Sequence, residues 1–529
     1  MSTRFHATDR AAHLTVVIGV VVAVGAVGAV GALGPVRLLA ADLPLIDAVT
    51  SGNHAATRAL LAEGVDVDAR QGDGATALHW AVHLDDHQMV EMLLRAGADV
   101  DAVNDLGVAP LLIASTNGNA AVVRLLLEAG ADPNGGPPDR ERPLMHAAWV
   151  GSLGAVTALL DGGADPNGTE PARGQTALMW AVSERHPAVV KLLLDRGADL
   201  HAKTVTHLTG GAAERDVTGY TALLFAARVG DLQSARALLD AGANPNAAAT
   251  DQLSALALAT IRGHIDVAML LLERGADPND GAPGHTPLHW AAGWWETTLT
   301  TSDFRAGREG NDEWNALPGI TAGRVELVRA LLAHGADPNA RLERPPTRAG
   351  ATRSPELPEL VGATPFLLAA AGGDAELMGI LAEAGADTSL ATDIRSTPLM
   401  AAAGIGRVMG ENTLDEALLL EAARQAVQMG GDVSATDDIG NTALHYAAYH
   451  RLSELAQFLV DEGADLEARN KFGETPLWLS ELSIQFYGGG KYQIVPTRTG
   501  DVLRSLGAQA STPFYENARP RDWPDLALQ

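Results

Sequence analysis

The sequence contains no cysteine, and only 4% of its residues are aromatic. The absence of cysteine excludes disulfide bonds, thiolate metal sites and a cysteine nucleophile. Basic residues are also scarce, because 38 Lys and Arg stand against 65 Asp and Glu, which gives a formal net charge of −27. Nucleic acid is therefore not expected as a partner, since binding it requires cationic surface that replaces counterions. A protein partner with a basic surface fits this charge.

Glycine, by contrast, recurs at regular intervals along the sequence. Twelve times a Gly closes an apolar stretch, and in most cases a small residue and an Asp or Asn follow it, as in GADVDA at 97–102. Five of the eleven gaps between these glycines are 33 residues long. A fixed period of this length indicates stacked structural repeats. The glycines are Gly64, Gly97, Gly130, Gly163, Gly197, Gly242, Gly275, Gly335, Gly385, Gly430, Gly463 and Gly507.

Each repeat has the pattern of two short helices. The hydroxyl of Thr286 can cap a helix, and Pro287 suits the first helical position because its missing N–H is not needed there. About ten residues later a second helix carries apolar residues at i, i+3 and i+4, as at Val123, Leu126 and Leu127. The Gly that follows ends this helix in a left-handed conformation. One such hairpin cannot bury both of its faces, so consecutive hairpins must stack.

A second motif precedes most of these glycines: TALHWA at 76–81, TPLHWA at 286–291 and TALHYA at 442–447. With the 33-residue period, it resembles the T-P-L-H-x-A signature of ankyrin repeats. The resemblance covers roughly residues 42–507. It implies an all-α fold, an ankyrin-repeat solenoid of about twelve helix-turn-helix repeats. It also implies that the motif histidines, His79, His289 and His445, brace neighbouring turns.

The longer gaps between the glycines contain insertions into otherwise regular repeats. In repeat arrays, insertions map to loops on one face, often the binding face. The repeat domain then extends over 42–507, and 508–529 form a C-terminal tail. The insertions are expected near 203–218, 293–323, 341–361, 405–413 and 488–499.

Residues 1–41 have the features of an export signal. An uncharged apolar stretch from Leu14 to Leu33 follows Arg4 and Arg10. Cleavage after Ala41 would release the repeats into a periplasm or outside the cell. The alternative is an uncleaved membrane anchor with the repeats outside the cytoplasm, since twenty apolar residues can span a bilayer. The bias toward Ala, Gly, Arg and Asp suggests a bacterial source.

Neither a cofactor nor a metal site is predicted. The i, i+4, i+8 spacing of His79, His83 and His87 would suit a metal on one continuous helix, but His79 belongs to the repeat motif, which favours a structural role. The Asp residues that recur in the turns, such as Asp99 and Asp132, favour local turn bonding over a cation-binding row. No catalytic residue is predicted.

Aromatic side chains give the strongest indication of a binding site. One set lies at the fifth motif position and is expected to form a column, either as internal packing or as contact with a partner. A second set lies three or four residues later, where the resemblance implies a concave recognition surface. Trp294 and Trp295 start the longest insertion and alternatively pack it onto the array. The expected partner-contact residues are Trp80, Trp180, Phe225, Trp290 and Tyr446 in the first set, His83, Trp149, Arg228, Trp294 and Tyr449 in the second, and Trp295.

The leading hypothesis is an exported, non-enzymatic module that binds a protein partner through its concave face and inserted loops. One alternative is a secreted effector that acts on a host protein. Another is an enzyme whose site is built by the insertions. The enzyme has the least support, because no nucleophile, base and orienting group can be named together.

Overall fold

The computed structural model describes residues 43–136, 141–205, 219–250, 252–281, 284–293, 323–343, 360–405, 415–485 and 491–510. The chain divides into two compact units, Met1–Asp199 (unit 1) and Leu200–Gln529 (unit 2). The predicted export signal lies outside the described residues, as do most of the tail and large parts of four of the five insertions. The insertion near 488–499 is mostly described.

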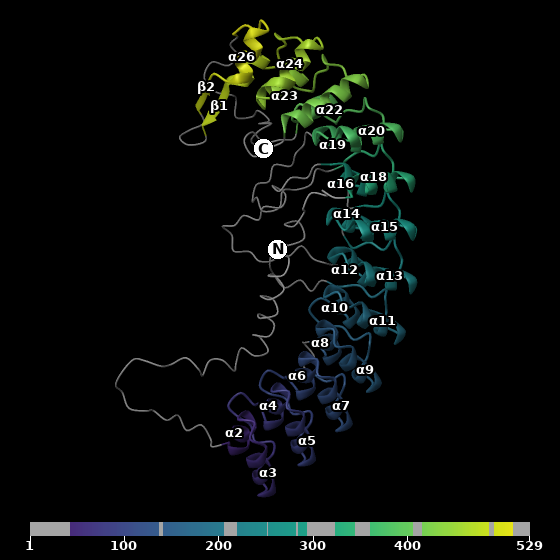
Figure 1. Ribbon diagram of the computed structural model, residues 1–529, viewed down its shortest axis with the longest axis vertical. Coiled ribbons are helices and arrows are strands. Elements are labelled where there is room, and N and C mark those ends of the chain that lie inside the picture. The colour runs from purple at the N-terminus through teal and green to yellow at the C-terminus, as the bar shows by residue number, and fades with distance from the viewer. Residues whose placement is uncertain are drawn as a thin grey trace, which may run out of the picture. The chain divides into compact units, whose positions relative to one another are not determined.

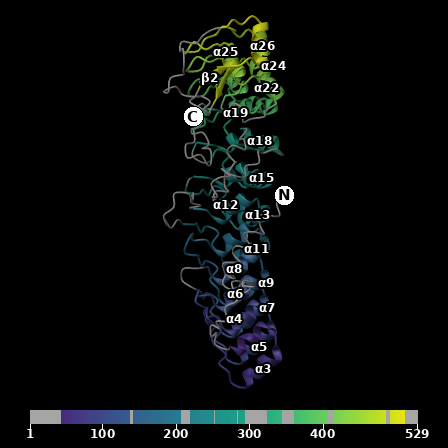
Figure 2. The same cartoon turned by 90° about the vertical axis from the view of Figure 1, so that its left-hand side faces the viewer.

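Unit 1 contains five helical hairpins in its described residues. The inner helix of each hairpin is followed by an outer helix of nine residues. The helices are α2 (Pro44–Thr50), α3 (His54–Ala62), α4 (Ala77–His83), α5 (His87–Arg95), α6 (Pro110–Asn117), α7 (Ala120–Glu128), α8 (Pro143–Val150), α9 (Leu153–Asp161), α10 (Ala177–Ser183) and α11 (Pro187–Asp195). Inner helices pack on inner helices and outer helices on outer ones, so they form two rows (Figure 1). The turns that join the repeats of unit 1 emerge on one side of these rows (Figure 2).

Unit 2 contains seven hairpins in its described residues, and its helices pack in the same two rows (Figure 1). Together the two units contain the twelve repeats that the glycine period predicts. The helices are α12 (Ala222–Val229), α13 (Leu232–Asp240), α14 (Ala255–Ile261), α15 (Ile265–Glu273), α16 (Pro287–Ala292), α18 (Arg324–Ala333), α19 (Pro365–Ala371), α20 (Ala375–Glu383), α21 (Pro398–Ala402), α22 (Glu416–Gln428), α23 (Ala443–Tyr449), α24 (Ser453–Asp461), α25 (Pro476–Glu481) and α26 (Arg498–Ser505).

The inner helices begin as the motif predicts. At α16 the backbone N–H of His289 donates to the hydroxyl of Thr286 at 3.4 Å, and Pro287 occupies the first turn. The same cap operates in unit 1, where the backbone N–H of Met179 donates to the hydroxyl of Thr176 at 3.3 Å. The hydroxyl satisfies one of the N–H groups that have no partner within the helix.

The outer helices end as predicted too. All twelve punctuating glycines have positive φ, from +80° at Gly64 to +108° at Gly507. A side chain strains the backbone in this left-handed region, which is why the position requires glycine. The predicted helix stop is therefore confirmed at each repeat.

The apolar stripe of the outer helices forms the interior. On α7, Val123 and Leu126 are fully buried, whereas Leu127 is half-buried. Val190 and Leu193 on α11 are fully buried in the same way, and Leu194 is half-buried. The predicted stripe is confirmed, and its last leucine lies at the margin of the core.

The all-α fold is confirmed, with one small addition in unit 2. A β-hairpin of β1 (Leu482–Gln485) and β2 (Lys491–Ile494) separates the two helices of the twelfth repeat. The strands are antiparallel, with Leu482 opposite Ile494. The insertion predicted near 488–499 is therefore partly a strand, and its end overlaps α26. The sequence KYQIV, rich in β-branched and aromatic residues, favours a strand here.

Candidate interaction surface

A histidine braces the inner helix to the next repeat in unit 1. His79 Nδ1 lies 3.2 Å from the backbone nitrogen of Thr76 and 2.9 Å from its hydroxyl. On the other side of the ring, Nε2 lies 3.0 Å from the carbonyl oxygen of Val108, which belongs to the following hairpin. Both ring nitrogens are therefore occupied by the fold. The structural role predicted for His79 is confirmed.

The same brace recurs twice in unit 2. His289 Nε2 lies 3.0 Å from the carbonyl oxygen of Ala340, and His445 Nε2 lies 3.2 Å from that of Glu474. Burial lowers the pKa of each of these histidines to about 4, because the charged imidazolium would lose its hydration. Both histidines are therefore neutral near pH 7. A neutral imidazole has one N–H that donates to the next repeat and one nitrogen that accepts from its own repeat, which is what this bridge requires.

In unit 1 the aromatic residues at the fifth motif position are partly exposed. Trp80 is half-buried, and its indole N–H donates to Gln71 Oε1 at 3.0 Å. Trp180 is half-buried too, with its ring 5.9 Å from that of His146. Trp180 Nε1 is buried and has no hydrogen-bond partner among the described residues. These two side chains thus have one packed face and one face open to a partner.

The equivalent residues of unit 2 are buried. Phe225, Trp290 and Tyr446 are only 3%, 2% and 7% exposed. The residues that precede each helix cover them, because Tyr220 packs edge-on against Phe225 and His285 stacks on Trp290 at 5.1 Å. The hydroxyl of Tyr446 donates to Asp437 Oδ2 at 2.5 Å. Internal packing, the alternative considered for this column, therefore fits all three.

The residues at the ends of the inner helices keep exposed surface. His83, Trp149, Arg228 and Tyr449 are all half-buried. The ring of His83 lies edge-on to that of Trp80, with centroids 5.8 Å apart, so repeat two contributes a pair. Trp149 is fixed in position because its carbonyl oxygen lies 3.0 Å from Nε2 of His186 in the next repeat. Trp294 and Trp295 lie outside the described residues.

Comparison with known proteins agrees with this geometry. A family model described as "Ankyrin repeats (3 copies)" matches residues 45–136, 135–204, 201–282, 223–298 and 366–470, which is more than half of the chain. The chain belongs to the ankyrin repeat family. Ankyrin repeats are modules for protein–protein interaction, and stacked repeats offer an extended binding surface.

Individual relatives share only part of their length with this ankyrin array. Human neurogenic locus notch homolog protein 1 is 33% identical over 141 residues, which are 22% of this chain and 6% of that protein. Mouse ankyrin repeat and SOCS box protein 16 is 32% identical over 122 residues, 23% of this chain and 26% of that protein. The crystal structure of the human ASB11 ankyrin repeat domain has 28% sequence identity and a TM-score of 0.38, and covers 44% of this chain and 99% of that one.

The turns of the ankyrin repeats are joined by a ladder of hydrogen bonds. Within a turn, Asp132 Oδ1 accepts from the backbone N–H of Asn134 at 2.9 Å. Asn134 then reaches the next repeat, where its Oδ1 accepts from the N–H of Asp165 at 2.8 Å and its Nδ2 donates to the carbonyl of Gly163 at 3.1 Å. We call this two-bond link the Asn clasp. The local turn bonding predicted for the recurring Asp residues is confirmed.

Two partly exposed positions of unit 1 are missing from the predicted set. Ile113 and Thr116 are half-buried and belong to the third repeat, where they hold the fifth and eighth motif positions. His146 holds the fifth position in the fourth repeat, and its Nδ1 lies 3.1 Å from the hydroxyl of Thr116. These repeats begin with Ala109 and Arg142 in place of the capping Thr. Counting from the helix start, instead of searching for aromatic residues, would have found all three.

The described residues contain no group of three or more His, Cys, Asp or Glu side chains placed to hold a metal ion. Within the same residues, no helix is long and apolar enough to cross a membrane.

Proposed function

We propose that the chain is an exported, non-enzymatic ankyrin module that binds a protein partner through unit 1. The contact surface would consist of the partly exposed residues of the inner helices, Trp80, His83, Trp149 and Trp180. Inserted loops of unit 2 would add contacts of their own. The excess of Asp and Glu over Lys and Arg favours a partner with a basic surface.

The observation that carries this proposal is the partial exposure of large aromatic rings on a rigid support. Trp149 and Trp180 lie on helices whose other faces are packed, and the carbonyl of Trp149 is held by the next repeat. Partly exposed, preorganised Trp residues bury their remaining apolar area on binding and lose little side-chain entropy. The arrangement therefore suits recognition of a partner surface.

Affinity capture with the chain from Asp42 onward tests the surface. Trp149→Ala and Trp180→Ala are expected to lower the yield of captured protein at least tenfold, since aromatic hot-spot residues contribute about 2 kcal/mol or more. Trp180→Phe should retain much of the binding, because the indole N–H has no partner to lose. Leu153→Ala is the matched control, since Leu153 is a 47% exposed apolar residue of an outer helix. Equal capture by all variants would remove unit 1 from the binding surface.

Export is tested separately, from the N-terminus of the protein made in its own cell. Edman sequencing or mass spectrometry should find Asp42 as the first residue, in the fraction outside the cytoplasm. Recovery of intact residues 1–41 in the membrane fraction would support the anchored alternative. Recovery of the intact chain in the cytoplasm would contradict export without affecting the proposed binding surface.

A further inference from the structure

The ladder of Asn clasps is interrupted on both sides of repeat ten, which consists of α21 and α22. In unit 2, clasps join repeats six to nine, through Asn246, Asn279 and Asn339. The next two turns carry Ser389 and Ser434 where the others carry Asn. Among the described residues no hydrogen bond crosses from either serine to the following repeat. Repeat ten thus lacks an Asn clasp on both faces. At the turn edge one weaker bond remains, because the hydroxyl of Thr388 donates to the carbonyl of Met429 at 3.4 Å.

The two serines bond within their own turns instead. The hydroxyl of Ser389 donates to Asp387 Oδ1 at 2.6 Å, and that of Ser434 donates to Asp432 Oδ1 at 2.7 Å. The hydroxyl of the serine holds the pKa of each of these carboxyl groups below its usual value. The backbone of these turns matches that of the clasped ones, because the N–H of Ser434 donates to Asp432 Oδ1 at 2.8 Å. The side chain is too short to reach further, so the gap results from residue type and not from backbone geometry.

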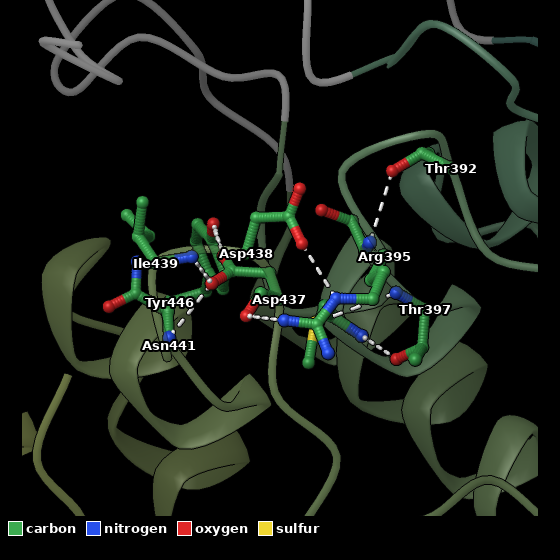
Figure 3. Close-up of polar contacts among 10 residues, drawn as sticks. Thr392, Arg395, Thr397, Asp437, Asp438, Ile439, Asn441 and Tyr446 are labelled. Atoms are coloured by element: carbon green, nitrogen blue, oxygen red, sulfur yellow. Dashed lines mark hydrogen bonds and ion pairs between the residues drawn. The ribbon is translucent and has the colours of Figure 1, made fainter. Parts of the chain in front are cut away.

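The hairpin tips that flank repeat ten, which we call the hairpin edge, are linked by Arg395. Its Nε lies 2.6 Å from Asp438 Oδ1, and its guanidinium donates to the carbonyl of Asp437 at 3.0 Å (Figure 3). Asp437 is itself fixed, because Oδ1 accepts from the backbone N–H groups of Ile439 and Asn441, each at 2.9 Å. The guanidinium therefore bonds to a rigid tip.

The backbone of Arg395 is strained. Its φ is +63°, in the left-handed region, and the equivalent residues of the next two tips are Gly440 and Gly473. A non-glycine residue is strained there, so a side chain at this position requires compensation from its contacts. The Arg395 link supplies such contacts, although both ends of the ion pair are more than half exposed, at 61% and 54%, which weakens it.

Repeat ten also has the least regular helices of unit 2. The inner helix α21 has five residues and the outer helix α22 has thirteen. In a stacked array, stability is a sum of terms within repeats and of terms at the seams, the interfaces between neighbouring repeats. At the seam between repeats ten and eleven, Glu416 Oε1 still accepts from the backbone N–H groups of Glu454 and Leu455, at 2.6 and 3.2 Å, so the loss of bonding is confined to the turn edge. A repeat whose turn edge is weakly bonded at both seams is where the array opens most easily.

We propose that unit 2 opens first at repeat ten, by separation of its turn edge while the Arg395 link holds the hairpin edge. The seams on either side of repeat ten act as a hinge, and repeats eleven and twelve move as one block beyond it. The hinge does not depend on the binding surface proposed for unit 1.

Hydrogen exchange of the full chain, followed by mass spectrometry of peptides, tests the hinge. The amides of α22 are expected to exchange at least tenfold faster than those of α15, whose repeat is clasped on both sides. The double variant Ser389→Asn/Ser434→Asn should slow the exchange of α22 about thirtyfold, the combined effect of two restored clasps. Protection of α22 equal to that of α15, or an unchanged rate in the double variant, would overturn the proposal.

Two further variants separate the hinge from a general loss of stability. Asn339→Ser removes a clasp from an intact seam and should speed exchange of α20 more than that of α22. Arg395→Gly removes the link but also relieves the left-handed strain, so the tip amides at 392–396 should exchange about twofold faster or more while α15 is unchanged. Equal acceleration of α15 in both variants would show a global effect and contradict a local hinge.

Discussion

Units 1 and 2 are built from the same helical hairpin, but they differ in regularity. In unit 1, hairpins follow one another at intervals of 33 or 34 residues, and Asp68, Asp101, Asn134 and Asn167 each link their turn to the next repeat. In unit 2, all five predicted insertions interrupt the series, and two consecutive turns carry Ser in place of the linking residue, with one 3.4 Å bond from Thr388 to the next repeat remaining. The comparison shows that the motif determines the hairpin, whereas the strength of each seam depends on single residues in the turns.

The two units also use the same motif position for different purposes. Trp80 and Trp180 keep exposed surface in unit 1, whereas Trp290 and Tyr446 are buried in unit 2 by the residues that precede their helices. An aromatic residue at this position therefore indicates neither packing nor binding by itself. The side chains of the adjacent tip decide which of the two applies.

The largest expected effect tests whether the two cores are equivalent. Leu126→Ala in unit 1 and Leu331→Ala in unit 2 each remove a fully buried side chain, so each should lower the free energy of unfolding by about 2 to 5 kcal/mol. Urea unfolding of the full chain measures this. Leu153→Ala serves as the exposed control, for which less than about 0.5 kcal/mol is expected. A much smaller loss for Leu331 than for Leu126 would show that the core of unit 2 is looser.

Acid is expected to affect unit 2 more than unit 1. Burial lowers the pKa of His289 and His445 to about 4, and it also lowers that of His79. Below pH 6.5 the unfolded chain takes up protons that the folded chain cannot, so stability is full above pH 6.5 and falls toward pH 4. Each of the two unit 2 histidines should cost about 2 kcal/mol at pH 5.

Urea unfolding at pH 7 and pH 5 measures this loss in the wild type and in His445→Gln. The variant should reduce the difference between the two pH values by about 2 kcal/mol, whatever its stability at pH 7. An unchanged pH dependence would mean that His445 is protonated in the folded state.

The Asn clasps should contribute equally in the two units wherever they are present. Asn134→Ser in unit 1 and Asn246→Ser in unit 2 reproduce the residue found at 389 and 434. Each should destabilise the chain by about 1 kcal/mol, since two partly exposed hydrogen bonds are lost. Thermal or urea unfolding measures the change. A negligible loss in both variants would show that the clasp has little energetic value and would also weaken the case for a hinge at repeat ten.

The smallest effect is expected for a pair of matched ion pairs on the outer helices. Arg196–Asp161 in unit 1 and Arg274–Asp240 in unit 2 have side-chain distances of 2.8 and 2.7 Å, and both are substantially exposed. Arg196→Ala and Arg274→Ala should each change the free energy of unfolding by less than about 1 kcal/mol, because solvent and salt screen such pairs. The free energy of unfolding is measured at low and high salt. A larger loss in only one unit would show that its ion pair contributes more to the interface between repeats.

Much of the fold was predictable because its signals are local and repeated. Thr286 and Pro287 start a helix, Gly335 ends the one that follows it, and His289 links to the next hairpin. These outcomes depend on backbone rules that hold at each repeat. The strand at 491–494 was missed, because a short segment within an insertion has no repeated context to identify it.

The candidate surface was predicted only in part. Trp149 and Trp180 are partly exposed, as binding residues must be, but their contact with a partner stays a prediction. Ile113 and Thr116 were not predicted, because their repeat begins with Ala109 instead of Thr and has no aromatic residue at either position. The burial of Phe225, Trp290 and Tyr446 could not be anticipated from their position in the motif.

The sequence by itself determined the helical hairpin, its period and the number of repeats, because caps, glycines and apolar spacing act within a few residues of one another. Only the tertiary structure decided which aromatic rings stay exposed and which seams carry a clasp. Burial of a ring depends on tip residues that lie nearby in the sequence but cover it only once the tip has folded onto the helix, as Tyr220 covers Phe225. Each clasp joins residues about 30 or more positions apart, which meet only after the repeats have stacked.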